Sequence, residues 1–172
     1  AMDAITQGDY NVAIGYNAAT TLTTGIRNVL IGGLAGDTMD TGTENTIVGY
    51  SAGGGLTSGQ YNVALGAFSL AAEDAHGRNI AIGYYALGAQ DAGADAYNIA
   101  IGHSAGANIS TGVRNTLVGG LAGDALTTGS YNTAVGYSAL STEDGDGRTT
   151  AIGYNALAAQ NAGSDAYNVA VG

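Results

Sequence analysis

The chain has 172 residues, of which 30 are glycine, and it contains no proline, cysteine or tryptophan. Hydrophobic residues make up 45% and charged residues only 10%, which excludes the apolar-poor, highly charged class of disordered chains. The net charge of −10, with no lysine, excludes a basic surface for nucleic acid or for anionic membranes. The lack of cysteine excludes a disulfide framework.

No apolar run approaches the ~20 residues of a membrane span, and no signal peptide is recognisable, so we expect no membrane insertion by this chain. Residues 1–2 resemble a cloning remnant. We expect residues 3–172 to form a single repeat domain that is a fragment of a longer fibre.

One phrase recurs along the whole chain. It reads YNVAIGYNA at 10–18, YNVALGAFS at 61–69, YNIAIGHSA at 97–105 and YNTAVGYSA at 131–139. Its asparagine lies at Asn11, Asn28, Asn45, Asn62, Asn79, Asn98, Asn115, Asn132 and Asn168, with Thr149 in the remaining unit. The step from Asn11 to Asn28 is repeated between all other units except two, which are slightly longer and begin at Asn79 and Thr149. A glycine always follows at the fourth position after the asparagine or threonine. Such spacing predicts a stacked repeat array.

From the N-terminus onward, each unit begins with a short β-favouring run after its asparagine. The runs are VAI, VLI, TIV, VAL, IAI, IAI, TLV, TAV, TAI and VAV, each followed by glycine. A weaker apolar position lies six residues before several asparagines, at Leu22, Met39, Leu56, Ile109 and Leu126, and predicts a second short strand in each coil. We therefore predict an all-β parallel β-solenoid of about ten coils of 17–19 residues. Coils ~4.8 Å apart would make a rod roughly 45–50 Å long.

Both faces of the predicted strand are apolar. Val12 and Ile14 point to one side and Ala13 to the other, because side chains alternate along a strand. One face fills the core of the coil, and the other needs a partner, since a long apolar stripe on a rod favours association. Which face lies inside is left open by the pattern.

Asparagine followed by xAIG or xAVG, repeated between glycine-rich turns, resembles the YadA-like head repeats of trimeric autotransporter adhesins. The variants TTGSYNTAVGYSAL and AIGYNAL also resemble repeats of phage tail-fibre proteins. The resemblance implies a left-handed β-roll that forms a homotrimer with the AIG strands inward. It also implies that Asn11 and Asn28 cap turns and that residues such as Val12 and Ile14 form the core. The function it implies is contact with a host-surface receptor or glycan, outside the cell, on a bacterial surface or a phage virion.

The residue before each asparagine forms a column of its own, which holds all four arginines. It reads Tyr10, Arg27, Glu44, Tyr61, Arg78, Tyr97, Arg114, Tyr131, Arg148 and Tyr167. Stacked about 5 Å apart, guanidinium and phenol groups attract each other, and Arg27 and Glu44 would form an ion pair. We interpret the column first as a stiffening ladder and, as the alternative, as a receptor or glycan contact ladder formed by its tyrosines and arginines.

The other candidates favour structural roles. A second column of aromatic residues, which includes Tyr16 and His103, is expected to pack, and neither His76 nor His103 has metal-ligand spacing. The acidic turns at 73–77 and 143–147 are interpreted as solvated, with Ca²⁺ binding as the alternative. We expect no catalytic residue, no metal and no cofactor.

These patterns predict a structural and adhesive fibre module that is not an enzyme. The alternative is a monomeric solenoid that binds a ligand or ice. Its support is a column of hydroxyl side chains at Thr24, Thr41, Ser58, Thr111 and Thr128.

Overall fold

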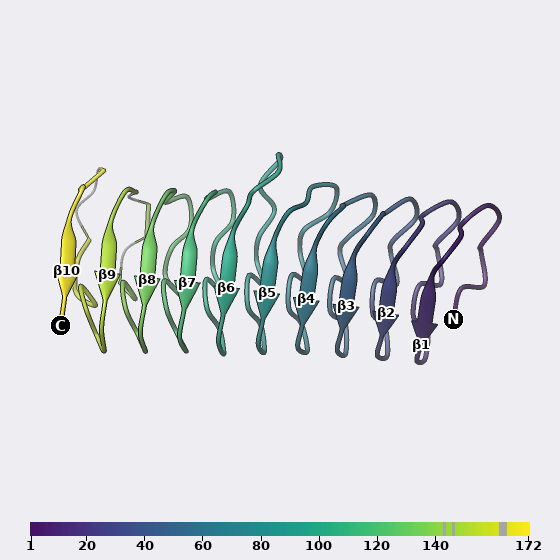
Figure 1. Ribbon diagram of the computed structural model, residues 1–172, viewed down its shortest axis with the longest axis horizontal. Coiled ribbons are helices and arrows are strands. Elements are labelled where there is room, and N and C mark those ends of the chain that lie inside the picture. The colour runs from purple at the N-terminus through teal and green to yellow at the C-terminus, as the bar shows by residue number, and fades with distance from the viewer. Residues whose placement is uncertain (143, 146, 162–164) are drawn as a thin grey trace.

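The computed structural model describes residues 1–142, 144–145, 147–161 and 165–172, and shows an all-β parallel solenoid of about nine turns (Figure 1). Ten three-residue strands follow one another along the rod in a single sheet of order β1 to β10. They are β1 (Val12–Ile14), β2 (Val29–Ile31), β3 (Thr46–Val48), β4 (Val63–Leu65), β5 (Ile80–Ile82), β6 (Ile99–Ile101), β7 (Thr116–Val118), β8 (Thr133–Val135), β9 (Thr150–Ile152) and β10 (Val169–Val171).

Each strand pairs in parallel with the equivalent strand of the next coil. Val12 lies beside Val29, and Ala13 beside Leu30, so the repeat step is also the pairing register. The two longer units keep this register, because their two extra residues lie between strands, and Ile80 still pairs with Ile99. The predicted in-register solenoid is confirmed. No helix that could cross a membrane occurs among the residues described.

The core is a single column of side chains inside the rod. The central residue of each strand from β2 to β9 is fully buried, as are Leu22, Met39, Leu56, Ile109 and Leu126. Large and small residues alternate within a coil: Leu30 precedes Gly36, whereas Ala64 precedes Leu70. A Cβ on Gly36 would lie 3.0 Å from Leu30 Cδ2, so in this coil the large residue leaves no room for a second one at the paired position.

Two expectations need correction. The predicted second strand is absent from the described residues, where the only pairing outside the ten strands is the bridge between Thr43 and Gln60. Left-handed residues such as Leu34 (φ 60°) and Gly36 (φ 54°) turn the chain sharply at this side of the coil, so it cannot extend. The core role implied for Val12 and Ile14 is also wrong, because these side chains point outward and are 44% and 59% exposed.

The asparagine column explains which face lies inside. Asn28 Nδ2 donates to Gly42 O at 2.7 Å, and Asn28 Oδ1 accepts the backbone N–H of Asn45 at 3.0 Å. These buried amides tie the strand to a turn, as the resemblance implied, and also link successive coils. Because the asparagine side chain points inward, strand alternation turns the next residue outward and the one after it inward.

The glycine at the fourth position after each asparagine is required by sterics. Gly15 has φ of 137°, a conformation that only glycine adopts readily. A Cβ on Gly15 would also lie 2.4 Å from Gly32 O in the next coil. Each coil can therefore stack closely on the next only if this position has no side chain.

Candidate functional site

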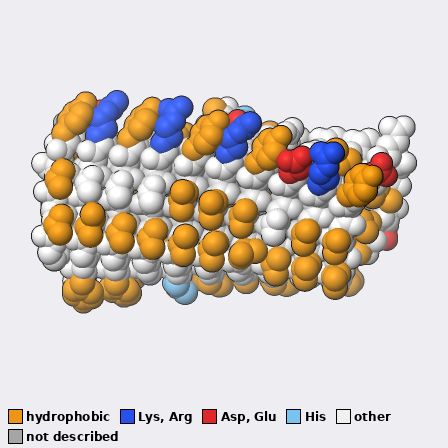
Figure 2. All heavy atoms as spheres, viewed as in Figure 1, with side chains coloured by type: hydrophobic (Ala, Val, Ile, Leu, Met, Phe, Trp, Pro, Cys, Tyr) orange, Lys and Arg blue, Asp and Glu red, His pale blue; other side chains and the backbone are white. Residues whose placement is uncertain are grey.

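The outward strand face is the largest candidate surface. We use this name for the first and third residues of β1 to β10, whose side chains form rows along the rod (Figure 2). The third residue is apolar in every coil: Ile14, Ile31, Val48, Leu65, Ile82, Ile101, Val118, Val135, Ile152 and Val171. The first residue is Val or Ile in six coils and Thr in four, and no charged side chain interrupts either row.

This face remains partly open to solvent along its whole length. Ile101 is 37% exposed in the middle of the rod, and Val171 is 75% exposed at its C-terminal end. Ten strands spaced ~4.8 Å apart make a face roughly 43 Å long. Continuous apolar surface on this scale is typical of association sites.

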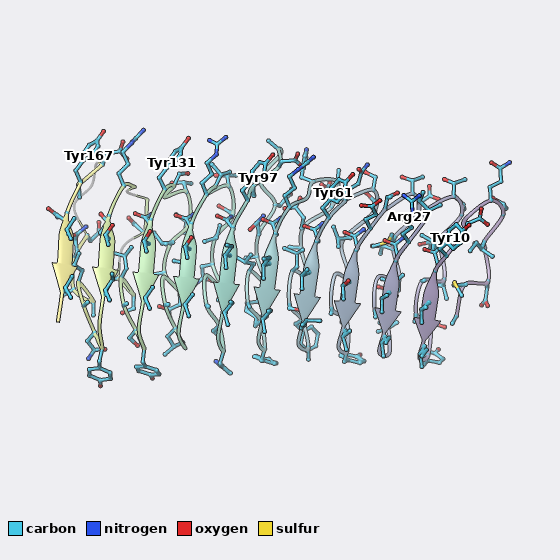
Figure 3. The ribbon with its side chains drawn as sticks, in the orientation of Figure 1. Tyr10, Arg27, Tyr61, Tyr97, Tyr131 and Tyr167 are labelled. Atoms are coloured by element: carbon cyan, nitrogen blue, oxygen red, sulfur yellow. The ribbon has the colours of Figure 1, made fainter. Side chains whose placement is uncertain are left out.

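Along one edge of this face lies the Arg–Tyr ladder, the column from Tyr10 to Tyr167 that includes Glu44. Figure 3 shows its labelled members projecting from the same edge of the rod. The carbon Cζ of Arg78 lies 5.1 Å from the ring centre of Tyr61 and 5.7 Å from that of Tyr97. The predicted stacking of arginine and tyrosine side chains along this column is therefore confirmed.

The stack continues through the second half of the ladder. Arg114 Cζ lies 6.0 Å from the Tyr97 ring centre and 5.4 Å from that of Tyr131. Arg148 Cζ lies 5.4 Å from Tyr131 and 5.5 Å from Tyr167. Tyr97 and Tyr131 thus carry a guanidinium from the coil on each side. Their ring faces are covered, and they present edges and hydroxyl groups rather than open platforms for sugar rings.

Every residue of the ladder has a left-handed backbone. The φ angles run from 51° at Tyr167 to 64° at Arg78. Non-glycine residues adopt this region at an energetic cost, and glycine or asparagine would occupy it more easily. Residues outside the ladder, such as Leu34 at φ 60°, share this conformation, so it belongs to the turns of the coil, where backbone bonds between coils such as Arg27 N–H to Asp9 O at 3.0 Å hold it.

Three of the four arginines have a carboxylate partner. Arg27 Nη1 lies 2.9 Å from Glu44 Oε1, which confirms the predicted ion pair. Arg78 pairs with Asp95. Arg148 pairs with Asp165. Arg114 instead donates to the Tyr131 hydroxyl at 2.5 Å.

The opposite edge of the outward strand face carries the tyrosine flank: Tyr16, Tyr50, Phe68, Tyr84, His103, Tyr137 and Tyr154. Tyr84 stacks on His103 with ring centres 5.2 Å apart, and Tyr137 stacks on Tyr154 at 5.9 Å. The expected packing role of this column is confirmed for these pairs. Phe68 was not expected here. It directly follows Ala67, the small column residue of the same coil, and contacts Tyr50 of the preceding coil edge-on at 5.5 Å.

The first acidic turn differs from the expectation of solvated carboxylates, because Glu73 is fully buried. Gln90 Nε2 donates to Glu73 Oε2 at 3.0 Å, and Gln90 Oε1 accepts from Asn98 Nδ2 at 2.8 Å. Burial raises the pKa of the Glu73 carboxyl above its ordinary value, against the hydrogen bonds from Gln90 and the His76 backbone. Sequence reasoning missed Gln90, whose role depends on the neighbouring coil.

Glu73, Asp74 and His76 are the described residues that come closest to a cation site. One ligand atom from each lies within 4.8 Å of the others. His76 Nδ1 is 3.5 Å from Glu73 Oε1 and 3.9 Å from Asp74 Oδ1. In the second acidic turn, positions 143 and 146 lie outside the described residues.

The described part of the chain encloses no pocket, so a ligand would contact an outer surface. Comparison of the chain with protein-family models, with curated proteins and with solved structures found no match.

Proposed function

We propose that this chain is a module of a surface fibre that assembles as a homotrimer and performs no catalysis. The outward strand faces of three left-handed β-rolls would pack around the fibre axis, and the Arg–Tyr ladder would remain at the surface to contact a host receptor or glycan. The fibre would lie outside the cell, on a bacterial surface or a phage virion.

The observation that supports this proposal best is the outward strand face. All ten residues in its third-position row are apolar, although the core of the rod is already filled by the opposite face. A monomer exposing this row would leave Val, Ile and Leu side chains in water, at about 25 cal/mol for each Å² that a partner could cover.

The size of the face also suits a partner that is another copy of the chain. A row pair about 10 Å wide and 43 Å long offers on the order of 400 Å² of apolar surface. The tyrosine flank at one edge extends this area toward the ~800 Å² per partner of a stable interface, while the Arg–Tyr ladder at the other edge stays outside it. Identical coils on each chain let equivalent rows meet along the full rod. The number three rests on the resemblance to the adhesin heads.

Sedimentation equilibrium tests the assembly. We expect a mass three times the 16.9 kDa of one chain. Replacing Ile82 and Ile101 by Glu should dissociate the trimer into folded monomers, because both side chains point outward from their own coils. The control is Thr111→Glu, which adds a charge at an exposed position away from the strands. A folded wild-type chain at 16.9 kDa would overturn the trimer.

The second candidate is a monomeric solenoid that binds a ligand or ice. It is favoured by the exposure of Thr24, Thr41, Thr111 and Thr128, which lie in one column. Thermal hysteresis of the monomeric chain, abolished by Thr41→Leu and Thr111→Leu, would establish this function in place of the fibre module.

A further inference from the structure

The Arg–Tyr ladder contains one arginine that lacks the carboxylate partner of the other three. Arg27 has Glu44 in the next coil, and Arg78 has Asp95. Both acids lie 17 residues after their arginine. The residue at the same separation from Arg114 is Tyr131. Among the described residues, no carboxylate pairs with Arg114.

The residue at the facing position of the next coil explains the difference. After Arg78, a longer unit places Asp95 at this position, and Tyr97 continues the ladder just beyond it. The units after Arg27 and Arg114 both have the ordinary length, and the facing residue is Glu44 in the first and Tyr131 in the second. Arg114 therefore keeps an uncompensated positive charge in a chain whose net charge is −10.

The surroundings of Arg114 leave its guanidinium available. The residue is exposed, and its backbone N–H is held by Ala96 O at 2.7 Å. Tyr97 and Tyr131 hold the guanidinium between their rings, at 6.0 and 5.4 Å, and are themselves 48% and 46% exposed. Guanidinium has five N–H donors, and Tyr131 takes only one of them, through a hydrogen bond of 2.5 Å.

We propose that Arg114, with the hydroxyl groups of Tyr97 and Tyr131, binds a carboxylate or sulfate group carried by a saccharide. This proposal rests on the fibre function above and names the ligand class of its contact flank. A planar guanidinium held by two rings can form a two-point hydrogen bond with such an anion. The phenol hydroxyls on either side can bond the hydroxyl groups of the attached sugar.

The charge of the whole chain limits the ligand. A rod with a net charge of −10 repels extended polyanions, whereas a sugar with a single anionic group meets one local cation. Because guanidinium groups cover both faces of Tyr97 and of Tyr131, a neutral sugar finds no open ring on which to stack there. Affinity should therefore depend on the anionic group.

Titration calorimetry with three saccharides tests the proposal. We expect the full chain to bind sialyllactose, which carries a carboxylate, or a sulfated lactose, and to bind unmodified lactose at least tenfold more weakly. Binding of one charged sugar and not the other identifies the anion. Arg114→Gln should reduce binding of the charged sugar at least tenfold. Arg27→Gln, which removes an arginine already paired with Glu44 and remote from Tyr97 and Tyr131, should leave it unchanged.

Two further variants test the role of the missing carboxylate. Asp95→Asn releases Arg78 while keeping an oxygen to accept the Gly77 N–H, so it should add a second binding site per chain. Tyr131→Glu copies the arrangement of Arg27 and Glu44 beside Arg114 and should abolish binding.

Equal losses in Arg114→Gln and Arg27→Gln, or no binding of either charged sugar by the wild-type chain, would overturn this site. Sedimentation mass is measured on the same samples. A trimer that binds no charged sugar therefore refutes only the ligand class, whereas a monomer that binds one refutes only the fibre assembly.

Discussion

Leu117 occupies the space that a side chain on Gly123 would need. A Cβ on Gly123 would lie 2.8 Å from Leu117 Cδ2. The corresponding pair in the next coil is Ala134 and Leu140, where the large residue is in the other position. Leu140 adopts φ of 56°, close to the 58° of Gly123, so the backbone at this site accepts leucine. In these two adjacent coils the large residue thus lies at the strand position in one and at the turn position in the other.

This relationship predicts a compensating pair of substitutions. Leu117→Ala alone should lower the free energy of unfolding by about 2–5 kcal/mol, since it opens a cavity in a filled core. Gly123→Leu alone should also destabilise, because the two side chains would overlap. The double variant copies Ala134 and Leu140, but Leu126 Cδ1 also lies 2.8 Å from the Cβ position of Gly123, so it should recover part of the lost stability. Urea unfolding measures all three, and a double variant no better than the sum of the single ones would contradict this compensation.

The asparagine column has one unsatisfied member. Asn79 Nδ2 is buried without a hydrogen-bond partner, whereas Asn115 Nδ2 donates to Gly129 O at 2.9 Å. The equivalent of Asn79 in the other longer unit is Thr149, the single break in the column. Asn79→Thr removes the orphaned donor, worth about 1–3 kcal/mol, but also the Oδ1 that accepts the Asn98 N–H at 3.1 Å, so we predict that it destabilises the fold less than the same change at a satisfied asparagine.

The matched control for this prediction is Asn115→Thr, which removes a satisfied amide and should lower stability. Thermal or urea unfolding of both variants gives the comparison. If the two substitutions had the same sign and size, the orphaned amide would not explain why threonine replaces asparagine at position 149.

The buried carboxyl of Glu73 predicts a pH dependence of stability. Burial raises its folded-state pKa, so the folded chain binds this proton more tightly than the unfolded chain does. The stabilising contribution of the protonated group is complete below the unfolded pKa of about 4.3 and is lost as pH rises through the folded pKa. Glu73→Gln should therefore be more stable than the wild type at pH 7.

The advantage of Glu73→Gln should shrink as the pH falls toward 4. Unfolding curves across this range check it, with Asp74→Asn as the control, because Asp74 is an exposed neighbour. A constant difference between Glu73→Gln and the wild type at all pH values would show that the effect comes from packing rather than from the proton.

Neighbouring residues of β5 should respond differently to the same charge. Ala81 is fully buried inside its coil, so Ala81→Glu places an unpaired carboxylate in the core and should unfold the chain, at a cost of several kcal/mol. Ile82→Glu points outward and should leave the coil folded. Circular dichroism separates the two outcomes, and a folded Ala81→Glu chain would contradict the inward orientation of this face.

The repeat phrase alone determined the parallel solenoid, its register and the strand after each asparagine, although it wrongly predicted a second strand in each coil. Three sequence features determine them: a β-favouring run, a glycine at which a side chain would meet the next coil, and a constant step. The constant step places equivalent residues of successive coils beside each other. The pairing of Arg27 with Glu44 followed from the same step, because a separation of 17 residues places them in adjacent coils.

Only the tertiary structure decided which strand face lies inside. Val12, Ala13 and Ile14 are all apolar, so hydrophobicity cannot distinguish the two faces, and the direction is set by asparagine amides that bond to neighbouring coils. The burial of Glu73 depends likewise on Gln90, one coil away. The uncompensated charge of Arg114 depends on the residue that faces it in the next coil, which is Tyr131 instead of an acid. Each of these properties arises from contacts between coils, which a pattern read within a single unit does not contain.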